Sequence, residues 1–100
     1  MVLTPKALDR SVLLTLRLPG TLRLVTEEPA ARSNQVLCST VHRFKGLERR
    51  VAIVAELDRS LPTDVAARTA LCYVAFSRPR TYLVLLGTAE VLPGLLPEPL

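Results

Sequence analysis

A polar segment in the middle of the chain lies between two apolar runs and carries side chains that could bind an anion. Thr40 and His42 can donate hydrogen bonds to phosphate oxygens. Lys45 adds a compact positive charge, and Gly46 lets a backbone approach a ligand closely. The Glu48 carboxylate would be repelled by phosphate, so it is better suited to accept a hydrogen bond from a hydroxyl such as a sugar's. The spacing indicates an anion site, and a solvated loop remains open as the alternative.

A second polar cluster, which contains Arg78, ends a later apolar stretch. Arg78 precedes Pro79, which biases its backbone toward extended geometry. The planar guanidinium suits a γ-phosphate during transfer, the role of an arginine finger. The alternative is compensation of a helix dipole, because a cation at a helix C-terminus is favourable by ~0.3–1 kcal/mol. Arg80 fits a surface charge or a phosphate contact of low specificity.

Composition places the chain among globular proteins. Its 100 residues, 49% of them hydrophobic, predict one domain or part of one. The net charge of +4 suits an anionic partner such as nucleic acid, although the cations are not gathered in blocks. Cys38 and Cys72 lack metal or redox spacing and are predicted to be free thiols. No apolar run approaches the ~18 residues of a membrane span, so we expect a cytoplasmic protein without membrane contact.

Two patterns predict a β-hairpin within an N-terminal segment, residues 1–34. Residues 12–18 and 21–25 alternate between apolar and polar side chains, with Leu14 and Leu16 on the apolar side. Pro19 and Gly20 between them fit a tight turn. Residues 27–34 are polar and predict a loop that ends this segment.

The remaining sequence predicts an α/β fold, a mainly parallel sheet with flanking helices, over residues 35–88. Apolar runs at residues 35–41, 50–57 and 82–86 predict strands that are buried on both faces. Between the last two, helical spacing begins after a capping Thr63 or Asp64, and its sparse charge predicts burial on more than one side. In such sheets ligands bind at the carboxyl ends of strands. Residues 89–100 form a proline-rich tail, which is expected to be extended or loose from Pro93 to Leu100.

Two segments resemble motifs of the UvrD/Rep-type superfamily-one DNA helicases. Residues 40–48 resemble T-[IV]-H-x-x-K-G-L-E, and residues 71–80 resemble L-x-Y-V-A-x-[ST]-R-[AP]-[RK]. The likeness covers roughly residues 35–87. It implies the C-terminal part of the second RecA-like domain, so the expected fold is a partial RecA-like fold preceded by the hairpin. Arg49 stands where an aromatic residue is common, and Pro79 where alanine is more frequent.

The resemblance also implies roles for the polar residues. Thr40 and His42 would contact the backbone of single-stranded DNA, with Lys45 near it. Gly46 and Glu48 would face the nucleotide, with Glu48 on the ribose. Arg78 would be the arginine finger that reaches the γ-phosphate of ATP held mainly by the other RecA-like domain. The chain would therefore be the C-terminal fragment of an ATP-dependent DNA helicase.

Half of an ATP site is missing from the sequence. It has no G-x-x-x-x-G-K-[ST] loop and no aspartate-glutamate pair after a strand, and Asp58 is not followed by a second acid. ATP and Mg²⁺ are therefore expected only in the complete enzyme, with an N-terminal RecA-like domain as partner, and the isolated chain is expected to be inactive. A non-catalytic nucleic-acid-binding or regulatory module, or a degenerate protein-interaction domain, remains the alternative. The intact Lys45, Glu48 and Arg78 argue against decay.

Overall fold

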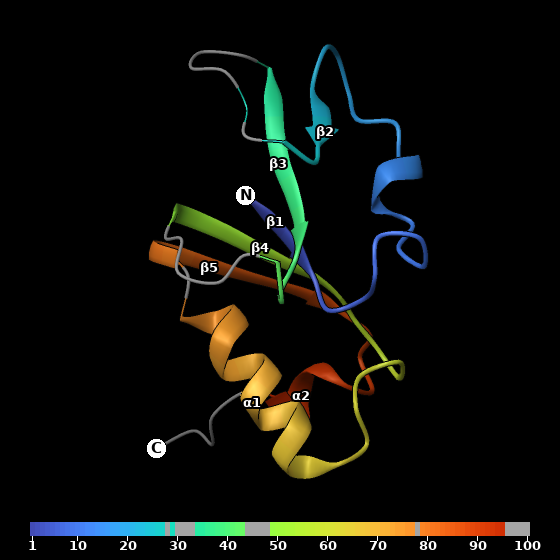
Figure 1. The fold of residues 1–100 in the computed structure, drawn as a ribbon, viewed down its shortest axis with the longest axis vertical. Coiled ribbons are helices and arrows are strands. Elements are labelled where there is room, and N and C mark those ends of the chain that lie inside the picture. The colour runs from blue at the N-terminus through green and yellow to red at the C-terminus, as the bar shows by residue number, and fades with distance from the viewer. Residues whose placement is uncertain (28, 30–33, 44–48, 78, 96–100) are drawn as a thin grey trace.

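The computed structural model describes residues 1–27, 29, 34–43, 49–77 and 79–95. Five parallel strands form one sheet in the order β2-β3-β1-β4-β5, with helices packed against it (Figure 1). The strands are β1 (Val2–Thr4), β2 (Arg23–Val25), β3 (Gln35–Thr40), β4 (Arg49–Leu57) and β5 (Pro79–Gly87). The α/β class and the parallel sheet are confirmed, and the arrangement is consistent with a partial RecA-like fold.

The centre of the sheet is β1, which the sequence analysis did not predict. It pairs with β3 through Thr4↔Thr40 and with β4 through Val2↔Ile53. Leu3 in its middle is completely buried. Three residues are too few to show an alternating pattern. The strand is therefore defined by its pairing with strands on both sides and not by a pattern of its own. Residues before 35 thus contribute two strands to the same sheet as the helicase-like segments.

The predicted β-hairpin is wrong. Residues Leu13–Thr15 form η1, a short 3-10 helix, and β2 runs parallel to β3 instead of antiparallel to a partner. Gly20 does have the left-handed φ of 65° that a tight turn uses. The alternation misled because Leu13 is 7% exposed and packs under the sheet, whereas Leu14 on the presumed apolar side is 42% exposed.

The helix α1 (Val65–Phe76) begins after Asp64, one of the two predicted caps, whose carboxylate accepts a hydrogen bond from the Ala67 N–H at 2.9 Å. Leu71 and Ala75 are buried against the sheet. The expectation of burial on more than one side is wrong, because Tyr73 on another face is 75% exposed. The short helix α2 (Leu92–Leu95) also corrects the expectation of a loose tail for residues 93–95, since its leucines pack against the core. Residues 96–100 lie outside the described residues.

Two apolar clusters occupy opposite faces of the sheet, because neighbouring strand residues point to opposite sides. The larger cluster lies beneath α1 and includes Leu3, Leu37, Val54 and Leu71. The smaller one consists of Val2, Leu13, Cys38 and Ala55. The expectation that residues 82–86 are buried on both faces is wrong: in β5, Tyr82, Val84 and Leu86 are exposed. No helix in the described part of the chain is long and apolar enough to cross a membrane.

Candidate functional site

The carboxyl end of the sheet, where β1, β3 and β4 finish, holds the described part of the predicted DNA-contacting segment. Thr40 ends β3 and is the register partner of Thr4, the last residue of β1. The Val41 N–H donates a hydrogen bond to the Thr4 carbonyl oxygen at 3.0 Å. The chain therefore leaves β3 with its direction fixed by the neighbouring strand.

The turn that follows β3 carries exposed polar residues next to a buried apolar one. The Thr40 hydroxyl oxygen accepts a hydrogen bond from the Arg43 N–H at 3.1 Å. This acceptance leaves the hydroxyl proton available to an acceptor such as a phosphate oxygen. Val41 is only 2% exposed, whereas His42 and Arg43 are exposed. Thr40 and His42 thus lie on either side of a residue that holds the turn in the core.

An apolar cavity of about 400 Å³ borders this turn. Its lining includes Val41 and His42 from the turn, Pro5 after β1, and Leu71 and Val74 from α1. His42 therefore has an apolar neighbour on one side and solvent on the other.

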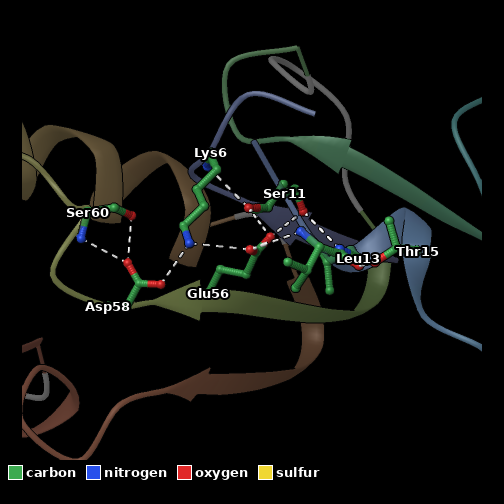
Figure 2. A network of polar contacts seen from close by, with 9 residues as sticks. Lys6, Ser11, Leu13, Thr15, Glu56, Asp58 and Ser60 are labelled. Carbon is green, nitrogen blue, oxygen red and sulfur yellow. Dashed lines mark hydrogen bonds and ion pairs between the residues drawn. The ribbon is translucent and has the colours of Figure 1, made fainter. Parts of the chain in front are cut away.

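A polar network occupies the same end of the sheet (Figure 2). Lys6 joins two carboxylates: its Nζ lies 2.9 Å from Asp58 Oδ2 and 3.5 Å from Glu56 Oε2. The Glu56 Oε1 accepts hydrogen bonds from the Thr4 hydroxyl at 2.9 Å and from the Ser11 hydroxyl. Asp58 accepts from the N–H and the hydroxyl of Ser60, at 2.8 Å and 2.6 Å. The network connects the end of β1, the segment before η1 and the end of β4.

Both carboxylates are stabilised as anions. Burial is the largest influence on Glu56 and raises its pKa, but hydrogen bonds from Ser11 and Thr4, with smaller contributions from Val12 and Lys6, outweigh it and leave the pKa lowered. Hydrogen bonds from Ser60 and Lys6 lower the pKa of Asp58 to about 2. The network therefore carries ionised groups at neutral pH.

The backbone of Glu56 is unusual. Its φ of 59° is the one positive value at a non-glycine residue in the described structure. The register with β5 shifts between Val54 and Leu57, so Glu56 lies in a bulge of β4. Such a conformation costs roughly 1–3 kcal/mol and persists only where the surroundings determine it strongly. Here the surroundings are the hydrogen bonds to the Glu56 carboxylate.

Sequence reasoning missed this network. The available signal was Glu56 itself, because a lone carboxylate inside an apolar strand requires partners. Lys6 was a second signal, since the chain has only two lysines. Their pairing could not be found without β1, which places Thr4 and Lys6 beside β4.

The predicted site residues Lys45, Gly46, Glu48 and Arg78 lie outside the described residues. The described residues that directly follow Glu48 and Arg78 in the chain are Arg49 and Pro79. These two are register partners at the amino ends of β4 and β5. We call this region the amino end of the sheet.

Residues 35–86 match the family of UvrD-like helicase C-terminal domains. This range is just over half of the chain, and the chain belongs to that family. No curated protein and no solved structure matches the chain. Membership identifies a helicase domain, which implies interaction with nucleic acid and a companion domain. The match spans both segments that resemble helicase motifs.

Proposed function

We propose that the chain supplies the DNA-contacting loop and the arginine finger of a shared ATP site in an ATP-dependent DNA helicase. Single-stranded DNA is contacted by Thr40, His42 and Lys45, and the nucleotide by Gly46, Glu48 and Arg78. The companion N-terminal RecA-like domain holds most of ATP and Mg²⁺.

The register of Arg49 with Pro79 carries this proposal. Glu48 directly precedes Arg49 in the sequence, and Arg78 directly precedes Pro79. This adjacency supports a role for both residues at one nucleotide. Thr40 ends β3 at the opposite end of the sheet. The nine residues of β4 span roughly 25–30 Å at ~3.3 Å per residue. DNA and nucleotide would therefore bind at well-separated ends of the same strands.

The charge of the amino end fits a polyphosphate. Arg49, Arg50 and Arg80 lie there, and the described residues 49–52 and 79–82 include no acid. Arginines gathered at one end of the sheet suit an anion such as Mg²⁺-bound ATP. At the carboxyl end, the proposed donors of Thr40 and His42 are a hydroxyl and an imidazole, which suit contacts to single phosphate groups.

The test measures DNA-stimulated ATP hydrolysis by this chain combined with its companion RecA-like domain. Arg78→Ala should lower the rate about 10³-fold, as loss of an arginine finger does in other phosphoryl-transfer enzymes. Arg59→Ala is the matched control, and we expect a change below about threefold, because Arg59 is exposed and pairs with Glu90 outside the proposed DNA and nucleotide contacts.

A loss of less than about twofold for Arg78→Ala would contradict the finger assignment. If the combined wild-type domains bind single-stranded DNA but show no DNA-stimulated turnover, the chain is instead a non-catalytic nucleic-acid-binding module.

A further inference from the structure

We propose that Glu56 is a positioning residue for DNA binding, which acts through Thr4 to hold the turn that presents Thr40 and His42. The inference rests on the proposed DNA contacts of those two residues. It assigns a role to a side chain that lies outside both motif-like segments.

A continuous chain of contacts joins Glu56 to the turn. The Glu56 Oε1 accepts a hydrogen bond from the Thr4 hydroxyl at 2.9 Å. Thr4 is the register partner of Thr40, and its carbonyl oxygen accepts the N–H of Val41 at 3.0 Å. Val41 is the residue between the two proposed DNA contacts. The end of β4 is thus tied to the start of the turn through one buried threonine.

Thr4 needs the carboxylate to keep its orientation. Thr4 is completely buried, and its hydroxyl oxygen already accepts a hydrogen bond from the Lys6 N–H at 3.1 Å. The hydroxyl proton must therefore find an acceptor inside the protein. Glu56 is that acceptor, and its side chain, 8% exposed, is held in turn by Ser11 and Lys6.

The bulge in β4 is what aims Glu56 at Thr4. With its φ of 59°, Glu56 departs from ordinary strand geometry at the point where the register shifts. A bulge re-aims a side chain in this way. Asp58 shares Lys6 with Glu56 but hydrogen-bonds to Ser60 and Lys6, on the other side of the network (Figure 2). It therefore offers a matched control that alters charge and leaves the Thr4 contact in place.

The experiment measures the affinity of the full chain for a fluorescently labelled oligothymidylate over a range of salt concentrations. Glu56→Gln keeps an oxygen that can accept from Thr4, but its NH2 group would face the Lys6 ammonium and the Val12 N–H. The side chain should therefore leave its position, and we expect about tenfold weaker binding. The dependence of log K on log[salt] should not change, because no cation that neutralises phosphate is lost. Asp58→Asn should change affinity less than twofold. In a chain that already carries Thr40→Val and His42→Ala, Glu56→Gln should add less than a twofold loss.

Three results would overturn the inference: no loss with Glu56→Gln, an equal loss with Asp58→Asn, or a full tenfold loss in the chain lacking both DNA contacts. The proposed function fails separately, and this inference with it, if the wild-type chain does not bind the oligonucleotide or if Thr40→Val with His42→Ala binds as tightly as wild type.

Thr4→Val supplies a second route should Glu56→Gln fail to fold. It removes the same link at its other end and should weaken binding about tenfold. Thr4→Ser retains the hydroxyl, and this variant should bind within twofold of wild type. Equal affinities for the two Thr4 variants would also contradict the positioning role.

Discussion

The two ends of the sheet differ in the charged residues that they carry. At the carboxyl end, the Glu56 and Asp58 carboxylates meet Lys6 and several hydroxyl and amide donors from the same chain. At the amino end, β4 begins with Arg49 and Arg50, and Arg80 is the second residue of β5. The described residues 49–52 and 79–82 include no acid. The carboxylates of the first end are paired within the chain, whereas the second end is rich in arginine.

This difference indicates which ligand each end would receive. A network whose charges are paired within the chain can hold a backbone turn in place. It leaves neutral donors, such as the Thr40 hydroxyl, to contact a ligand that moves along the site. Arginine-rich strand ends instead suit a compact polyanion that binds and leaves as a unit. Under the proposed function, DNA would bind at one end of the strands and the nucleotide at the other.

The largest expected effect on stability comes from breaking β1, which carries Thr4 to the carboxyl end. Leu3→Ala should lower the free energy of unfolding by about 2–5 kcal/mol, because Leu3 is completely buried between the two neighbouring strands. Urea denaturation followed by circular dichroism measures the change. Leu14→Ala is the control, since Leu14 is 42% exposed, and should change stability by less than about 0.5 kcal/mol. Equal losses would mean that β1 is not the centre of the fold.

The next largest effect concerns the positive charge of Lys45, which is proposed to contact DNA. Lys45→Ala should weaken binding of single-stranded DNA at low salt and reduce the slope of log K against log[salt] by about 0.7. A titration at four or more salt concentrations gives the slope. Lys6→Met is a suitable comparison, because the Lys6 charge is already paired with two carboxylates and its loss should leave the slope unchanged. A slope that changes only in the Lys6 variant would reverse the assignment.

The smallest expected effect is the contribution of Asp58 to stability and its pH dependence. Its pKa is lowered in the folded protein from 3.8 to about 2, so the stabilisation is complete above about pH 4 and is lost as the pH falls toward 2. Asp58→Asn should therefore lower stability by about 1 kcal/mol at pH 7 and make little difference at pH 2. Thermal unfolding at both pH values measures this. A penalty that grows on acidification would contradict the ion pair.

The sequence predicted the elements whose patterns are long. Strands β3 and β4 and the helix α1 with its Asp64 cap followed from apolar runs and capping chemistry. It failed for β1, because three residues carry no period, and for residues 12–18, where hydrogen bonds around Ser11 and the burial of Leu13 override the alternation. It also overestimated the burial of β5, since apolar composition alone does not say what covers a strand.

For the candidate site, two motif-like segments were enough to predict the family, because their order and spacing are specific. They located Thr40 and His42, and the structure shows that these two residues lie at the carboxyl end of the sheet. The roles of Lys45, Gly46, Glu48 and Arg78 stay predictions. The network around Glu56 could not be predicted, since it depends on a bulge and on contacts 45 and 52 residues apart in the chain.

The separation of the two ends is tested most directly by the affinity of the chain for single-stranded DNA without nucleotide. We predict that Thr40→Val weakens binding about tenfold, because a hydrogen bond to a charged phosphate is lost. Arg78→Ala should leave the affinity within about twofold, since its partner would be the nucleotide at the other end. An Arg78→Ala variant that loses as much DNA affinity as Thr40→Val would contradict the account.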